Sequence, residues 1–253
     1  MHTSRGRITV ATIAAVGVIV AGCSSSSSGT GASGVPRSGS NSSSTSAGSD
    51  IASLPADQIA SKAIASLREA KSFRVAGSVV AGTDRADVDL GLTDTGSAGT
   101  VAVSGTEVQV IVIGTDGYLK ASDAAWRKFL AGQPNVEAIV ELLRGKWIKG
   151  SSSDDRFAGL FSITKKSLVD DLASEKGPFT KTATRVIAGQ EAVGVTATDS
   201  TLYVSTKDAR PLESEPVSGS TSSGKVTFTD YDAVPEPTPP PAEQTIDSSK
   251  LGR

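Results

Sequence analysis

The most regular pattern in the chain is an alternation of apolar and polar residues that begins at Phe73 and continues to Ala121. Apolar side chains recur at every second position over short runs, and Gly, Asp and Thr residues separate these runs. A period of two is that of a β-strand with one buried face, so the pattern predicts an antiparallel meander with one dry face. The residues predicted to face inward are Phe73, Val75, Val79, Val88, Leu90, Leu92, Val101, Val103, Val108, Val110 and Val112.

Helical spacing precedes the meander and returns after it. Pro55 and Asp57 predict the first turn of an amphipathic helix that ends near Lys71. Further helices are predicted over residues 122–132, 134–145, 157–161 and 168–172. Strands are predicted again over residues 179–187, 192–198, 201–206, 212–217 and 225–231. The order of these elements predicts an α+β fold in a domain that spans residues 51–235.

The C-terminal segment differs in composition from the domain. Seven residues from Pro235 to Pro241 include five prolines, which favour polyproline II over helix or sheet. We therefore expect residues 236–253 to form a Pro-rich disordered tail.

The N-terminus has the layout of a secretory signal peptide. Arg5 and Arg7 precede an apolar run from Ile8 to Ala21, which is short for a membrane span, since a span needs about 20 apolar residues. Cys23 follows directly after small residues, the position at which bacterial lipoproteins receive a lipid. We expect cleavage of residues 1–22 and an anchor at Cys23 on the extracytoplasmic face of the cell membrane. An uncleaved membrane anchor is the alternative.

Residues 23–50 combine this cysteine with a Ser/Gly-rich stretch that predicts a flexible tether. Loss of residues 1–22 removes Arg5 and Arg7, which leaves 23 basic residues against 27 acidic ones. This mildly acidic balance argues against nucleic-acid binding, which needs a clustered basic face.

Composition also excludes most hydrolase chemistry. The single histidine, His2, leaves with the signal peptide, and the single cysteine, Cys23, is taken by the lipid. No imidazole base, Ser-His-Asp triad, thiol nucleophile or His-ligated zinc site is left. We therefore predict a protein that is not an enzyme and that uses neither a cofactor nor a metal.

Three short patterns nevertheless suggest chemistry. Ser162-Ile163-Thr164-Lys165 matches the S-x-x-K of penicillin-recognising enzymes, and Lys181-Thr182-Ala183 is close to K-T-G. No Ser-Asp-Asn accompanies them, so a Ser-Lys hydrolase is a minor alternative. Asp84, Asp87 and Asp89 suggest a cation site, although a solvated strand face is the commoner cause of such a pattern.

The order of elements and several short motifs resemble a known family. The motifs are Tyr118-Leu119-Lys120-Ala121 followed by a helix with Trp126, then Lys146-Trp147-Ile148-Lys149, Gly189-Gln190-Glu191-Ala192 and Val226-Thr227-Phe228-Thr229-Asp230-Tyr231. Over residues 50–240 the chain is similar to the LppX/LprG-type actinobacterial lipoproteins, within the wider LolA/LolB-like lipoprotein-carrier architecture. The chain departs from that family in having few aromatic residues and many small ones.

This resemblance implies a strongly curved antiparallel sheet, a half-barrel, with helices packed on its concave face. It also implies an apolar cavity for the acyl chains of a lipid or glycolipid, and a role in envelope lipid transport or retention. The inward-facing residues above are then candidates for the cavity lining, together with Phe129, Phe157, Leu160 and Phe161.

Each candidate has a simpler interpretation as ordinary core packing. The helical sets that contain Trp126, Phe129 and Leu130, or Phe157, Leu160 and Phe161, are either a lid over the cavity or plain amphipathic helices. The expected partners are membrane lipid through Cys23 and a lipid or glycolipid ligand, in a monomer. The alternative function is an envelope protein-interaction or sensory module whose core is filled and which binds no lipid.

Overall fold

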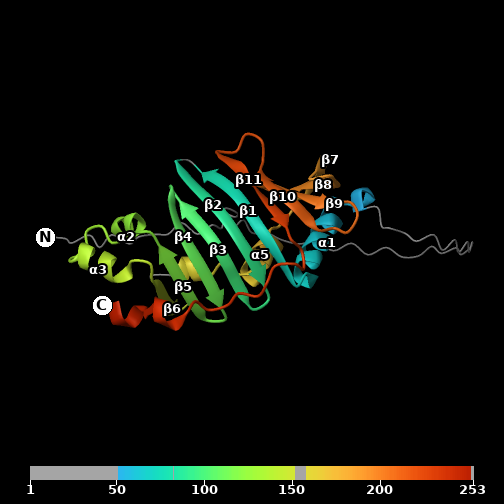
Figure 1. Ribbon diagram of the computed structural model, residues 1–253. Helices are drawn as coiled ribbons and strands as arrows, with labels where there is room; N and C mark the ends of the chain where they lie inside the picture. Colours follow the sequence, from blue (N-terminus) through green and yellow to red (C-terminus); the bar gives the residue numbers. More distant parts are fainter. Residues whose placement is uncertain (1–50, 82, 152–157, 252–253) are drawn as a thin grey trace, which may run out of the picture.

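The computed structural model describes residues 51–81, 83–151 and 158–251 (Figure 1). The α-helices are α1 (Ala56–Glu69), α2 (Asp123–Phe129), α3 (Val136–Leu143), α4 (Ala158–Phe161) and α5 (Lys165–Ser174). The strands are β1 (Ser72–Ala81), β2 (Asp84–Thr93), β3 (Gly96–Val103), β4 (Thr106–Ile113), β5 (Asp116–Ala121), β6 (Trp147–Ser151), β7 (Thr180–Ile187), β8 (Gln190–Thr196), β9 (Ser200–Ser205), β10 (Pro211–Pro216), β11 (Ser222–Thr229) and β12 (Thr245–Asp247). Three short 3₁₀ helices, η1 (Ile51–Ser53), η2 (Ala242–Gln244) and η3 (Ser248–Leu251), complete the described elements.

All twelve strands belong to one open, curved sheet. Their order is β12-β6-β5-β4-β3-β2-β1-β11-β10-β9-β8-β7, so the two predicted groups of strands meet where β1 pairs with β11. Every neighbouring pair is antiparallel except β12 and β6, which are parallel. The α+β half-barrel is therefore confirmed, with one parallel strand added at its edge.

The register places the predicted inward-facing residues on one face, in rows that cross the strands. Phe73 lies opposite Leu92, and Val112 continues the same row beyond Ser97. Val79 lies opposite Ala86, and Val103 continues that row. We call the end of this face with the β2–β3 and β4–β5 turns the closed end, and the end with the β1–β2 and β3–β4 turns the open end.

Two glycines in the central strands allow the sheet to bend. Gly77 and Gly99 both have φ near +153°, a conformation that side-chain-bearing residues rarely adopt. A Cβ atom would lie 2.1 Å from the Lys225 carbonyl oxygen at Gly77 and 2.0 Å from that of Asp89 at Gly99. Glycine within a strand is a common cause of tight bends, and only glycine fits at these two crossings.

The five helices bury the apolar face of the sheet. One hydrophobic cluster joins Leu67 of α1, Trp126 of α2, Val140 of α3, Phe161 of α4 and Val169 of α5 to the inward-facing strand residues. A second cluster packs Ile59, Ala60 and Ala63 of α1 against Val193 and Val204. Helix α1 thus spans two parts of the sheet, and η1 anchors the start of the domain beside β8 through buried Ile51.

The C-terminal segment corrects the prediction of a disordered tail over residues 236–253. In Figure 1 this segment, drawn in red, runs along the lower edge of the sheet to β6. There β12 pairs in parallel with β6, with Thr245 opposite Trp147 and Ile246 opposite Ile148. Lys146 also donates a hydrogen bond to the Glu243 carbonyl oxygen over 3.0 Å.

Two glycines on the convex face leave space for the segment that leads to β12. A Cβ atom at Gly91 would lie 2.5 Å from the Val234 side chain, and one at Gly96 would lie 3.0 Å from the Pro237 ring. Between these contacts the Glu236 carboxylate accepts hydrogen bonds from the hydroxyl groups of Thr93 and Thr95. Partners elsewhere in the fold therefore order a segment whose own composition favours disorder.

Candidate functional site

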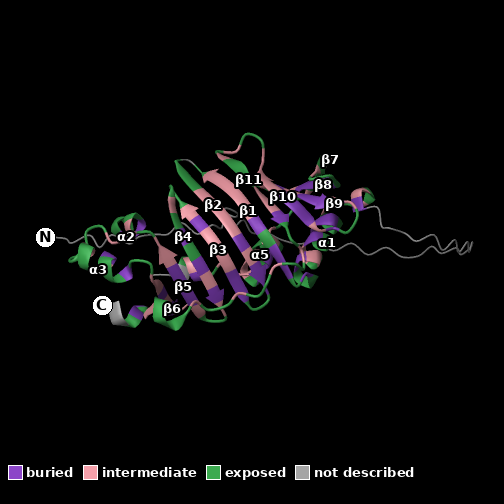
Figure 2. Cartoon of the chain, viewed as in Figure 1, coloured by how far each residue is buried: buried purple, intermediate pink, exposed green. Residues whose placement is uncertain are grey.

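The inward-facing candidates are not equally buried. Phe73, Val75, Leu90, Leu92, Val101, Val108, Val110 and Val112 are each at most 7% exposed. Toward the open end the helices cover the face less completely. There Val79 and Val88 are half-buried, and Val103 is 41% exposed. Figure 2 shows the same gradient as purple near the lower ends of the central strands and pink or green near their upper ends.

The ring of Phe161 seals the closed end and occupies the space beside Gly117, which has no side chain. Phe161 of α4 is 1% exposed, and a Cβ atom at Gly117 would lie 2.3 Å from its ring. Ser97 donates a hydrogen bond over 2.7 Å to the Ile163 carbonyl oxygen, which fixes the chain between α4 and α5. Leu160 is half-buried against the same cluster. Phe157 and Cys23, the other candidates, lie outside the described residues.

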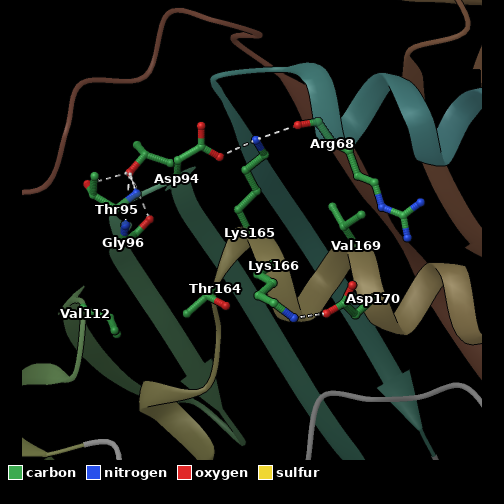
Figure 3. Close-up of a pocket in the computed structure, with 12 residues that line it drawn as sticks. Arg68, Asp94, Thr95, Gly96, Val112, Thr164, Lys165, Lys166, Val169 and Asp170 are labelled. Carbon is green, nitrogen blue, oxygen red and sulfur yellow. Dashed lines mark hydrogen bonds and ion pairs between the residues drawn. The ribbon is translucent and has the colours of Figure 1, made fainter.

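A buried lysine completes this end and explains the S-x-x-K match. Lys165 is 5% exposed, and its ammonium group donates to the Arg68 carbonyl oxygen and, over 2.6 Å, to Asp94 (Figure 3). It also donates to the Ala70 carbonyl oxygen, directly after the end of α1. All three of its N–H donors therefore have acceptors. Two of these acceptors are carbonyl oxygens at the C-terminal end of α1, which Lys165 caps. The Ser162 hydroxyl donates instead to the Gly159 carbonyl oxygen. Both residues have structural partners.

Two pockets lie near the ends of the central strands. One, of about 460 Å³, is lined by Asp94, Lys165 and Asp170 around the N-terminus of α5 (Figure 3). The other, of about 620 Å³, is lined by Gln109, Lys120 and Lys128 beside α2. Of the inward-facing candidates only Val112 lines either pocket. Helix side chains pack against the buried rows of the apolar face.

At the open end, α2 lies beside the β3–β4 turn. Ser122 caps the helix by accepting a hydrogen bond from the Ala125 amide, as its position before the helix predicts. Lys128 at the other end donates to the Thr106 hydroxyl over 2.7 Å and to the Ser104 carbonyl oxygen. Phe129 is 41% exposed, so this lid candidate does not seal the face.

Trp126 packs against Phe129 and has a buried polar atom without a hydrogen-bond partner in the described part of the chain. The two ring centroids are 6.0 Å apart in an edge-to-face arrangement, and Trp126 is only 3% exposed. The atom is its indole N–H. Leaving such a donor unpaired costs about 1–3 kcal/mol. The sequence pattern does not mark Trp126 as a cavity residue, because a tryptophan on an apolar helix face also fits plain core packing.

A second unsatisfied group lies at the open end, at the C-terminus of α5. One carboxylate oxygen of Glu175 is buried without a partner among the described residues. Burial, together with the charge of Asp199 in the β8–β9 turn, raises the pKa of Glu175. Strand β10 ends at the open end of the sheet, and the amide of Val217, directly after β10, donates a hydrogen bond to the Asp199 carbonyl oxygen. Asp199 therefore lies at the open end as well.

Two of the three acidic residues that suggested a cation site have arginine partners, and the third, Asp84, accepts a hydrogen bond from the Ser104 hydroxyl over 3.5 Å. Asp87 pairs with Arg85 and Asp89 with Arg74, each over 2.6 Å on the convex face. Across residues 51–81, 83–151 and 158–251, no group of three His, Cys, Asp or Glu side chains is placed to hold a metal ion. Within the same ranges no helix is long and apolar enough to cross a membrane.

Comparisons with known proteins identify the fold. No family model matches the chain, and no curated protein matches it by sequence. Among solved structures, LprF from Mycobacterium bovis is similar with a TM-score of 0.50 and 14% identity, over 73% of this chain and 96% of LprF. Lipoprotein LppX from Mycobacterium tuberculosis has a TM-score of 0.45 and 12% identity, over 71% of this chain and 98% of LppX. The chain has the LppX/LprG-type lipoprotein fold, as the motifs predicted.

Proposed function

We propose that this chain is a membrane-anchored extracytoplasmic lipoprotein that binds the acyl chains of a lipid or glycolipid, for transport or retention of that lipid in the envelope. The observation that carries the proposal is the apolar concave face, which is sealed at the closed end and incompletely covered at the open end. The fold shared with LprF supports it. In this proposal Cys23 holds the anchor, and the protein has no catalytic role.

Lipid entry needs a movable cover, and α2 with α3 is suited to that role. Arg144 pairs with Asp123 over 2.9 Å and Arg127 with Glu137 over 3.0 Å, so exposed ion pairs join the two helices. Exposed pairs of this kind contribute little to stability, and they are kept when the two helices move as one unit. An outward shift of the two helices would open the hydrophobic cluster that Trp126 and Val140 share with Val101 and Val108. Each methylene of an acyl chain buried there gains about 0.8 kcal/mol, which offsets the loss of helix contacts.

Lipid co-purification tests this proposal. The full chain with Cys23→Ala, produced in an actinobacterial host, lacks the anchor lipid, so any lipid seen by native mass spectrometry is a ligand. We expect a discrete adduct whose extract contains acyl chains. A matched sample with Val101→Asp, which places a charge on the buried face, should lose the adduct if it folds by circular dichroism. An unliganded wild-type mass that persists after incubation with acyl lipids would contradict the proposal.

A second candidate is an envelope protein-interaction module, which is favoured by the helix side chains packed over most of the concave face. The edge strand β7 offers a surface for it, since Val186 is 72% exposed and no strand lies beyond β7 in the described sheet. Unpaired strand edges bind extended segments of partner proteins. Crosslinking that returns a stoichiometric partner, lost in Val186→Lys, together with no lipid adduct, would favour this candidate.

A further inference from the structure

We propose that the indole N–H of Trp126 is a ligand contact and that it donates a hydrogen bond to an ester carbonyl at the polar end of a bound acyl lipid. This inference rests on the proposed function and narrows the ligand to lipids whose chains are joined by esters. It assigns a binding role to a residue that otherwise belongs to the core.

The first support is the unsatisfied donor itself. An indole nitrogen only donates, so it needs an acceptor. Buried polar groups in folded proteins nearly always have one, and exceptions call for an explanation. The Trp126 N–H is buried, has no acceptor in the described part of the chain, and belongs to a cluster of apolar side chains.

The second support is the place of Trp126 on the concave face. It lies on α2, one turn after Ser122 and two residues before Lys128, which contacts the β3–β4 turn. In the same part of the sheet Val108 is 4% exposed, whereas Val103, nearer the turn, is 41% exposed. Trp126 therefore lies where the sealed part of the face gives way to the uncovered part.

This boundary fits the chemistry of an ester-linked lipid. A chain that enters from the open end places its terminal methyl group toward the sealed rows and its polar end toward solvent. The ester carbonyl, the first polar group after the methylenes, then comes to the boundary. A carbonyl oxygen accepts a hydrogen bond well in an apolar site, where an unpaired donor is most costly.

Trp147 provides a matched control. It is the only other tryptophan in the chain, it is half-buried on the convex face, and its ring lies 5.8 Å from the Lys120 ammonium group. It has no place on the concave face, because its neighbour Ile148 is the residue that packs into the core. Trp147→Phe leaves a single indole signal, that of Trp126.

The direct test keeps Trp126 unchanged. The full chain with Cys23→Ala and Trp147→Phe, labelled with ¹⁵N at indole nitrogen, is titrated with dipalmitoylglycerol or with its dihexadecyl ether analogue, which lacks both carbonyl groups. We expect a downfield shift and slower hydrogen exchange of the Trp126 indole proton with the ester lipid only. Equal indole spectra with both bound lipids would overturn the inference. So would slow hydrogen exchange of the Trp126 indole proton in the lipid-free protein, if an internal water accepts its hydrogen bond.

A variant measures the contribution to affinity. Trp126→Phe keeps an aromatic ring and removes the donor, so the affinity for the diester should fall about five- to tenfold and that for the diether should not. Thermal unfolding of the lipid-free variant reports whether it folds. Loss of affinity for both lipids to the same degree would mean that Trp126 only packs. Binding of neither lipid by the wild type would instead contradict the proposed function itself.

Discussion

The closed and open ends of the concave face are formed by the same strands but are covered very differently. At the closed end the ring of Phe161 fills the space beside Gly117, and Lys165 joins α1, α5 and the β2–β3 turn. At the open end Val103 and Phe129 are partly exposed. Two of the three buried, unpartnered side-chain atoms in the described residues also lie there, on Trp126 and Glu175.

This difference indicates that the closed end contributes mainly to the stability of the fold and that the open end is suited to binding. Satisfied polar groups and close packing fix a single arrangement, whereas exposed apolar surface and unpaired polar atoms cost free energy unless something binds them. We therefore expect substitutions at the closed end to destabilise the fold and substitutions at the open end to affect mainly ligand binding.

The largest expected effect is that of Phe161→Ala. Removal of a fully buried phenylalanine leaves a cavity beside Gly117 and should lower the free energy of unfolding by about 3–5 kcal/mol. Urea denaturation followed by circular dichroism measures the change. The matched control is Phe129→Ala, which should cost less than about 1 kcal/mol because its ring is already 41% exposed. Similar losses for the two variants would remove the distinction between the ends.

Lys165→Met should have the next largest effect. It leaves the carbonyl oxygens at the end of α1 without their donor and separates Asp94 from its partner, so we expect a loss of about 1.5–3 kcal/mol in denaturation experiments. Lys166→Met is the control, since that side chain is 86% exposed and should change stability by less than about 0.5 kcal/mol. Ser162→Ala should also be nearly silent, whereas a Ser-Lys hydrolase would lose labelling by an acylating probe.

Gly117→Ala tests the fit between the sheet and Phe161. The added methyl group overlaps the ring, and overpacking of a dense core typically costs about 1–3 kcal/mol. The double variant with Phe161→Leu should lose less than the sum of the two single losses, because the smaller side chain makes room for the methyl group. Strictly additive losses in urea denaturation would show that the ring does not occupy this space.

The sequence predicted the strands better than it predicted their cover. Alternation placed Leu90, Val101 and Val110 on one buried face, because the two-residue period is local. Whether that face is sealed depends on contacts between distant segments. The packing of Phe161 against Gly117 joins residues that are far apart in the chain, and no periodicity encodes it.

The C-terminal segment shows the same limit. Its prolines predict disorder by composition, yet Val234 and Pro237 lie against Gly91 and Gly96 in β2 and β3. Glycines that face outward on a strand look like weak points in a linear sequence. They act here as sites for another segment, which only the folded sheet reveals.

The smallest expected effect in stability, and the most specific to the open end, is that of Glu175→Gln. The pKa of Glu175 is raised above its ordinary value of 4.5, so the folded protein binds this proton more tightly than the unfolded chain. The free energy of unfolding therefore falls as pH rises from the unfolded pKa through the folded one. Glutamine removes that loss, so the variant should gain stability over the wild type at about pH 7 relative to about pH 4.

The difference between the two proteins isolates this residue, since other carboxylates titrate equally in both. Asp199→Asn removes one cause of the raised pKa and keeps the carbonyl oxygen that Val217 uses, so it should reproduce part of the gain. Urea denaturation at both pH values, with carboxyl NMR of Glu175, measures both effects. The variant and the wild type could instead change stability in parallel between these pH values. That outcome would show that the carboxylate of Glu175 is solvated and that the C-terminus of α5 is not buried at the open end.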